Sequence, residues 1–303
     1  MKHHQVIIIG LGPGGIGAAI TLKENNIDVL VVEKEVPGGK VNVAPRVDNY
    51  PGYTKIKGPD LAYELYKKYK SYNIPTLFNE VISLKKNDDI ITVELDNHEV
   101  LSCDYVIIAS GTKERLIGLE KEESLLGHGL SYCSICDGHF YKNKVVAVIG
   151  GGNAALKEAI HLSDIVSKLY LIHRRNEFRG SLNLVNELKE KENVKILTPY
   201  IPLEIVGEDK VEGLVIQNKE DNSIINLKID GLFPLVGQLP NTQFVDVDIL
   251  DEYKTIPVDK NKMSRSDRIY AIGDVLPREI RQIYLAEFDG KIAAKNIIER
   301  IKN

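Results

Sequence analysis

The feature that most constrains this chain is a pattern that occurs twice: a run of β-branched residues, a glycine-rich turn and a stretch with helical periodicity. The first copy has its apolar run at 6–9 and its turn at 10–15; the second has them at 145–149 and 150–152. Short apolar runs bounded by glycine and followed by a helical stretch are typical of βαβ units with a buried parallel sheet. The sequence therefore predicts an α/β protein with two nucleotide-binding units.

Two further glycine-containing breaks, at Gly111 and Gly237, lie on either side of the second unit. The chain after the second break contains a strand-like run and a long helical stretch but no phosphate-binding turn, so it must pack onto a sheet already built. We therefore predict two three-layer, Rossmann-like domains, the second inserted in the first, with glycine hinges at the crossings. The predicted boundaries give residues 1–111 and 242–303 to the first domain and residues 112–241 to the second.

The first turn fits the pattern G-x-G-x-x-G between a strand and a helix. Its glycines permit close approach of the backbone to a pyrophosphate at the helix N-terminus. An acid follows at the end of the next strand-like run, at the distance where it can bond ribose hydroxyls. A purely structural turn is the alternative, but the context and the acid favour a dinucleotide. The predicted contacts are Gly10, Gly12, Pro13, Gly14, Gly15 and Glu33.

The second turn is of the G-x-G-x-x-A type, and basic residues rather than an acid follow its second strand-like run. Arginine grips a phosphate through paired N–H donors, so this cluster suits the 2′-phosphate of NADPH better than the free ribose of NADH. The alternative is a solvated basic loop. The predicted NADPH contacts are Gly150, Gly152, Asn153, Ala154, Ala155, His173, Arg174, Arg175 and Arg179.

A C-x-x-C pair, Cys133 and Cys136, lies between the two units with Asp137 directly after it. Two thiols at this spacing can close and reopen a disulfide, and the neighbouring acid can exchange protons with them. Zinc is the alternative, with His139 as a further ligand and Cys103 or His128 as a fourth. No second ligand pair of recognisable spacing exists, so we predict a redox pair and no metal. Cys103 itself is predicted to be an inert buried thiol.

A hydride donor and a disulfide acceptor need an intermediary, and flavin is the usual carrier. The first unit is therefore predicted to hold FAD. The C-x-x-C lies in the inserted segment with the NADPH turn, so nicotinamide and disulfide would alternate at one flavin ring. This predicts rotation of the inserted domain about Gly111 and Gly237.

Charge, hydropathy and cysteine content limit which partners and which cellular location we expect. Lys and Arg total 39 and Asp and Glu total 43, a net charge of −4, which predicts no nucleic-acid partner. The apolar run near the N-terminus is too short for a membrane span and lacks a small-residue cleavage site, so no membrane partner is predicted. A C-x-x-C pair without a larger disulfide framework fits a cytoplasmic address.

Taken together, these segments resemble the low-molecular-weight thioredoxin reductases. The resemblance also rests on Gly38-Gly39, Asn49-Tyr50-Pro51-Gly52, Cys133-x-x-Cys136-Asp137-Gly138, Phe178-Arg179, Pro240-Asn241-Thr242, Gly273-Asp274 and Arg281-Gln282. It implies that Cys136 faces the flavin and Cys133 attacks the substrate disulfide. It also implies a homodimer, a thioredoxin or similar small redoxin as partner, and further FAD contacts at Gly39, Lys40, Asn49, Gly111, Asp274, Arg281, Gln282 and Ile283.

Several positions depart from this family's pattern. Lys40 stands where glutamine is usual, and Tyr284, Leu285, Glu287 and Phe288 replace small residues and threonine at the expected flavin edge. An acid near that edge is expected to make flavin reduction harder. Lys157 replaces an acid beside Glu158, and His128 stands where an arginine often contacts the thioredoxin.

Three alternative functions remain open on the sequence. The same scaffold could reduce another redoxin or a peroxiredoxin, because the docking surface rather than the dithiol selects the partner. It could take electrons from ferredoxin or a flavodoxin, although the intact second turn and its arginines favour NADPH. A non-catalytic redox sensor that binds nucleotide is the third.

Overall fold

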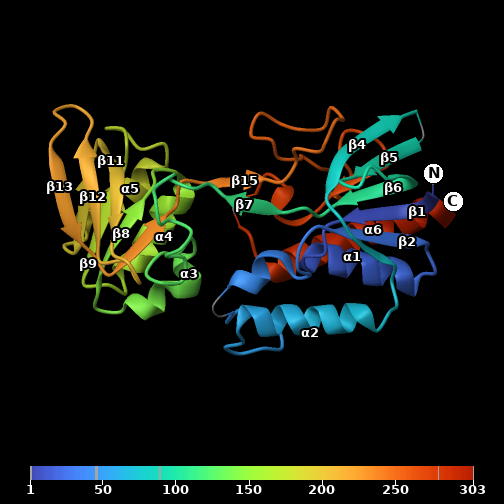
Figure 1. Ribbon diagram of the computed structural model, residues 1–303, viewed down its shortest axis with the longest axis horizontal. Coiled ribbons are helices and arrows are strands. Elements are labelled where there is room, and N and C mark those ends of the chain that lie inside the picture. Colours follow the sequence, from blue (N-terminus) through green and yellow to red (C-terminus); the bar gives the residue numbers. More distant parts are fainter. Residues whose placement is uncertain (1, 45–46, 89, 279, 303) are drawn as a thin grey trace. The chain divides into compact units, whose positions relative to one another are not determined.

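The computed structural model describes residues 2–44, 47–88, 90–278 and 280–302, and of Cys136 it describes the backbone but not the side chain (Figure 1). The chain folds into two compact units. Unit 1 consists of Met1–Lys113 and Leu239–Asn303, and unit 2 is the continuous segment Glu114–Gln238. These limits differ by a few residues from the predicted crossings at 111–112 and 241–242.

Unit 1 is built on a mixed sheet with the strand order β3-β2-β1-β6-β5-β4, and β16 pairs with β6. The sheet has a parallel part made of β1, β2, β3, β6 and β16. β5 pairs antiparallel with β6, and β4 pairs antiparallel with β5. The strands are β1 (Lys2–Ile9), β2 (Val29–Glu33), β3 (Thr76–Phe78), β4 (Val81–Asn87), β5 (Ile90–Leu95), β6 (Val100–Ile108) and β16 (Ile269–Ala271). The parallel part confirms the predicted α/β class; the antiparallel hairpin is an addition.

Helices α1 (Pro13–Glu24), α2 (Gly58–Lys70) and α6 (Ile283–Lys302) lie on one side of this sheet (Figure 1). Short 3-10 helices occur at Gly39–Val43 and Gly273–Val275. α1 and α6 cross backbone to backbone, because a Cβ on Gly290 would lie 2.2 Å from the Gly14 carbonyl oxygen. α6 comes from the C-terminal segment, so the core of unit 1 needs both ends of the chain.

Unit 2 has three layers around a parallel sheet of order β10-β9-β8-β14. In β8, Val146 and Val148 face α4 and α5, and Ala147 and Ile149 face a small antiparallel sheet, as the period of two along a strand requires. The elements are β8 (Val145–Ile149), β9 (Lys168–Ile172), β10 (Val194–Leu197), β14 (Gly231–Pro234), α4 (Asn153–Ser163), α5 (Leu182–Glu190), β11 (Tyr200–Val206), β12 (Gly213–Asn218) and β13 (Ile224–Lys228).

The chain passes between the units through β7 (Thr112–Glu114) and β15 (Gln238–Pro240), which pair with each other. Gly111 and Gly237 stand beside these strands with φ of +65° and +111°, in the left-handed region. Nothing lies within 4 Å of where a Cβ would be at either glycine. The backbone conformation, and not a lack of space, therefore favours glycine at both positions. In the described chain, no helix has the length and apolar character needed to cross a membrane.

Candidate active site

The cysteine pair lies at a short helix, α3 (Ser134–Asp137), that begins directly after Cys133. Cys133 is partly buried and carries a disulfide. Cys103 is a free thiol in the core of unit 1, where burial raises its pKa to about 12. A thiol that stays protonated is a poor nucleophile, so Cys103 has the inert character predicted for it. The side chain of Cys136 lies outside the described part of the chain, and its role facing the flavin stays a prediction.

Asp137 is buried beside Cys133, with 8 % of its surface exposed. Its Oδ2 accepts a hydrogen bond from the Ser131 hydroxyl at 2.5 Å, and the same Ser131 oxygen accepts the Cys133 N–H at 3.1 Å. The other carboxyl oxygen, Oδ1, is buried without a hydrogen-bond partner among the described residues. Burial raises the pKa of Asp137 above its ordinary value, although the Ser131 bond opposes the rise. The arrangement suits a group that holds and releases a proton near the thiols.

Two other acids, the buried Glu122 and the partly buried Glu158, hold the chain on either side of Cys133, and the sequence reasoning assigned neither to this role. Glu122, 2 % exposed, accepts hydrogen bonds from the Tyr132 hydroxyl at 2.8 Å and from the Ile117 and Gly118 N–H groups at 2.9 Å each. Glu158 of α4 accepts the Ser134 N–H at 3.0 Å. These acids fix the cysteine turn against the rest of unit 2.

The nucleotide turn of unit 2 opens α4, whose first residue is Asn153. The Asn153 side chain accepts the Ser181 N–H at 2.8 Å, which ties the turn to the chain after the basic cluster. Arg174, Arg175 and Arg179 are exposed, and within the described residues none of their guanidinium groups is paired with a carboxylate. The three cations are therefore available to an anionic ligand.

His173 differs from the arginines that follow it. It is buried, and its ring stacks on Phe178 with the centroids 5.0 Å apart. Burial lowers the pKa of His173, and the neighbouring arginines lower it further, so the ring is neutral near pH 7. In this structure His173 supports the basic cluster by packing and adds no charge to it.

The nucleotide turn of unit 1 opens α1, with Pro13 as the first helical residue. The first bond of the helix runs from Ile16 N–H to the Gly12 carbonyl at 2.9 Å, so the N–H groups of the first turn have no helical acceptor. Glu33, at the end of β2, is buried, and its Oε2 accepts the Leu11 N–H at 2.5 Å. The predicted acid and the predicted turn therefore lie in direct contact.

Residues of unit 1 that are distant in the sequence meet at the N-terminus of α6. Asn49 donates a hydrogen bond to Gln282, directly before α6, at 2.7 Å. Lys40, another predicted FAD contact, donates one to the Thr112 hydroxyl at 3.0 Å. The Nε of Arg281 is buried without a partner among the described residues. Asn49, Gln282 and Arg281 thus lie at one end of α6, and their contact with FAD stays a prediction.

A buried ion cluster supports the turn that carries Asp274. Asp289 of α6 accepts the Gly273 N–H at 3.2 Å, forms an ion pair with Lys262 at 2.9 Å, and bonds the Arg278 guanidinium. The sequence analysis missed this cluster, because its members lie far apart in the chain and match no local pattern.

The zinc alternative gains no support from the described part of the chain. No group of three or more His, Cys, Asp or Glu side chains there is arranged to hold a metal ion. The Cys136 side chain, one member of the proposed zinc set, lies outside that part.

Known proteins resemble this chain over nearly its whole length. The family pyridine nucleotide-disulphide oxidoreductase matches residues 4–290. Thioredoxin reductase of Mycoplasma genitalium is 36% identical, covering 98% of this chain and 95% of the relative. The crystal structure of thioredoxin reductase from Streptococcus pyogenes has a TM-score of 0.89 and 32% identity, and covers 99% of each chain. A ferredoxin-flavin thioredoxin reductase from Clostridium acetobutylicum has a TM-score of 0.55 and 28% identity, covering 100% of this chain and 99% of the other. The predicted family is confirmed: this chain belongs to the pyridine nucleotide-disulphide oxidoreductases and, within them, to the low-molecular-weight thioredoxin reductases.

Proposed function

We propose that this enzyme passes electrons from NADPH through FAD to the Cys133/Cys136 disulfide and then to oxidised thioredoxin or a similar small redoxin. The observation that carries the proposal is the content of unit 2. That unit holds a nucleotide turn, three arginines that pair with no carboxylate among the described residues, and a disulfide-bonded Cys133 beside a buried acid. A nicotinamide donor and a redox disulfide on one unit require a carrier on the other, and FAD supplies that two-electron carrier when bound.

The residues of unit 1 fit FAD. The unpaired N–H groups at the start of α1 suit its pyrophosphate, and Glu33 beside them suits the ribose. At the start of α6, the Nε of Arg281 is buried without a hydrogen-bond acceptor among the described residues, so it could donate to a bound ligand. Asn49 and Gln282 stand at the same place, where we propose that the isoalloxazine edge lies. The N–H groups that open α6 favour a negatively charged ring.

In unit 2 we propose that Arg174, Arg175 and Arg179 bind the 2′-phosphate of NADPH, and that the turn Gly150–Ala155 binds its pyrophosphate. The Cys133 thiolate attacks one sulfur of the redoxin disulfide, and Cys136 then attacks Cys133 and releases the reduced redoxin. Asp137 holds the proton that the departing thiolate takes up.

Exposed apolar side chains flank the cysteine turn and support a docking role for it. Ile135 is 63 % exposed and Phe140 is 53 % exposed. The backbone freedom of Gly111 and Gly237 supports a rotation of unit 2 that brings nicotinamide and disulfide in turn to the flavin. We further propose that the enzyme is a homodimer and acts in the cytoplasm.

The test is an anaerobic titration of the yellow holoenzyme. NADPH should bleach the flavin rapidly, NADH should do so slowly, and oxidised thioredoxin should restore the colour. Cys133→Ser and Cys136→Ser should keep bleaching by NADPH and lose thioredoxin reduction, and Cys103→Ser should keep both. Thioredoxin reduction by Cys136→Ser would overturn the proposal.

The second candidate function is reduction of the same disulfide with ferredoxin as electron donor, favoured by the likeness to the Clostridium acetobutylicum enzyme. The same titration separates the two donors. A flavin that NADPH leaves oxidised and that reduced ferredoxin bleaches would establish the second.

A further inference from the structure

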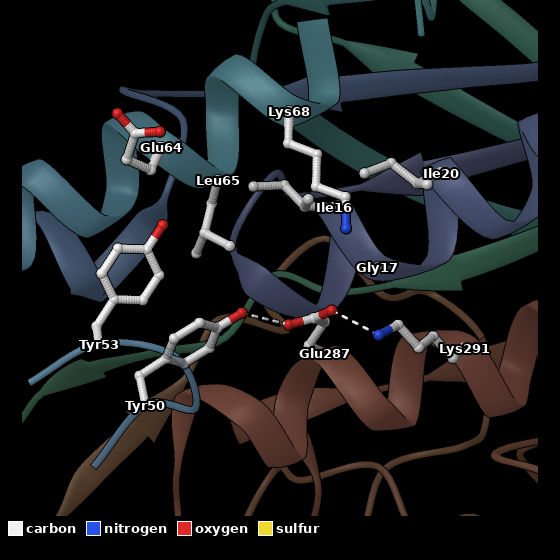
Figure 2. A pocket seen from close by; sticks show the side chains of 10 residues that line it. All are labelled: Ile16, Gly17, Ile20, Tyr50, Tyr53, Glu64, Leu65, Lys68, Glu287 and Lys291. Atoms are coloured by element: carbon white, nitrogen blue, oxygen red, sulfur yellow. Dashed lines mark hydrogen bonds and ion pairs between the residues drawn. The ribbon is translucent and has the colours of Figure 1, made fainter. Parts of the chain in front are cut away.

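Glu287 departs from the pattern of the resembled family, and its surroundings in unit 1 assign it a role. It lies in the second turn of α6, with 18 % of its side chain exposed. Its Oε2 accepts the Tyr50 hydroxyl at 2.6 Å, and its Oε1 forms an ion pair with Lys291 at 2.6 Å. Figure 2 shows the three side chains in line, with Glu287 in the middle. Burial alone would raise the pKa of Glu287, but the bonds from Lys291 and Tyr50 outweigh it and lower the pKa, so the carboxylate is charged.

Tyr50 belongs to a turn closed by backbone hydrogen bonds between Val47 and Ile56, at 2.7 and 3.1 Å. The residue before it, Asn49, bonds Gln282. The turn is therefore tied to α6 by two neighbouring side chains, one at the start of the helix and one in its second turn. An arrangement of this kind restricts both the position and the orientation of Asn49.

Open space lies on both sides of this connection. A cavity of about 330 Å³ is bounded by α1, α2 and the Tyr50 turn (Figure 2), and another of about 420 Å³ lies toward Tyr284 and Phe288. Tyr50, Glu287 and Lys291 line both cavities. Apolar side chains of the turn, among them Val47 and Ile56, pack in the core of unit 1, and the polar contacts to α6 add to this packing.

The ion pair also bears on the electrostatic effect expected of an acid at this place. A lone carboxylate would offset the positive potential at the N-terminus of α6, which begins at Ile283. The Lys291 ammonium lies one helical turn further on and neutralises it. The expectation that Glu287 makes flavin reduction harder treated the charge as unpaired.

We propose that Tyr50, Glu287 and Lys291 form a charge-neutral clamp that positions the Asn49 turn at the flavin edge. All three are positioning residues, since the proposal gives none of them contact with the reacting atoms. The inference rests on the FAD site proposed above for unit 1.

The first test measures FAD release from the holoenzyme on dilution. Tyr50→Phe and Glu287→Ala each remove the hydrogen bond of the clamp, and each should weaken FAD binding about tenfold, the effect of losing one hydrogen bond to a charged group. The double variant should be no weaker than Glu287→Ala alone, because the two changes break the same contact. Tyr53→Phe is the matched control, since it alters a tyrosine in the same turn that lines the same cavity, and it should bind FAD as the unaltered enzyme does.

The second test measures the midpoint potential of the bound flavin, which a purely structural change would not move in a sign-dependent way. Lys291→Met leaves the carboxylate unpaired and should lower the potential. Glu287→Gln leaves the ammonium unpaired and should raise it. Shifts of the same sign, or none, would refute the clamp.

The possible outcomes distinguish a failure of the clamp proposal from a failure of the proposed FAD site on which it rests. If the unaltered enzyme binds no FAD, the proposed function fails. If it binds and reduces FAD and the clamp variants match it in affinity and potential, only the clamp fails. Thermal unfolding of each variant shows whether it is folded.

Discussion

Ser131→Ala tests the proposed proton chemistry at the cysteine turn most directly. The Ser131 hydroxyl donates to Asp137 at 2.5 Å, and within the described residues no other hydrogen bond reaches that carboxylate. Alanine removes the bond while keeping the small side chain. The other titratable groups that interact electrostatically with Asp137 are His139 and Tyr141.

The size of the effect follows from what the bond stabilises. A hydrogen bond to a buried charged group is worth about 1.5–3 kcal/mol, and one pKa unit corresponds to about 1.4 kcal/mol. The bond favours the carboxylate over the acid, so its loss should raise the pKa of Asp137 by about 1–2 units. The protonated acid then persists to higher pH, and the alkaline limb of activity should move upward by the same amount.

The assay is the pH dependence of kcat/KM for the redoxin disulfide. Ser134→Ala is the matched control, because Ser134 is also buried beside Cys133 and, among the described residues, its hydroxyl makes no hydrogen bond to Asp137. Ser131→Thr keeps the hydroxyl and should keep the profile. An unchanged alkaline limb in Ser131→Ala, or an equal shift in Ser134→Ala, would refute the reasoning.

Three further changes have expected outcomes. Asp137→Asn should abolish disulfide reduction yet raise the Tm near pH 7. Burial raises the pKa of Asp137 in the folded state, so the wild-type carboxylate destabilises the fold once the pH exceeds the pKa of the unfolded state, and asparagine removes this cost. That gain should vanish below about pH 4. Asp289→Ala leaves Lys262 and Arg278 without their shared partner and should lower the free energy of urea unfolding by about 3 kcal/mol. Arg174→Ala should reduce the preference for NADPH over NADH about tenfold or more in kcat/KM, with Lys142→Ala as an exposed control.

The features that are encoded by residues close together in the sequence were predictable. Both nucleotide turns, the insertion and the inert Cys103 follow from local patterns that the structure preserves. The contacts that tune the site were not predictable, because they join distant segments. Tyr50 and Glu287 are 237 residues apart, and no periodicity brings them together.

The antiparallel elements were missed for another reason. β4 and β5 are half-exposed, and they lack the continuous apolar run that marks a buried strand. The prediction for Glu287 considered its charge and its place on the helix. It took into account neither the ion pair of Glu287 with Lys291 nor the hydrogen bond from Tyr50, which the folded Asn49 turn brings to α6.

The insertion of unit 2 has a consequence for the order of events during synthesis. Residues Val106–Ile108 of β6 pair with β16, and α1 packs its glycines against α6, so unit 1 lacks a strand and a covering helix until the C-terminal segment emerges. Unit 2 is continuous and is complete on the growing chain well before then. Domains generally fold as units as they leave the ribosome. Unit 2, which carries the redox cysteines, can therefore fold first. Until β16 is synthesised, the part of β6 that pairs with it remains unpaired in unit 1.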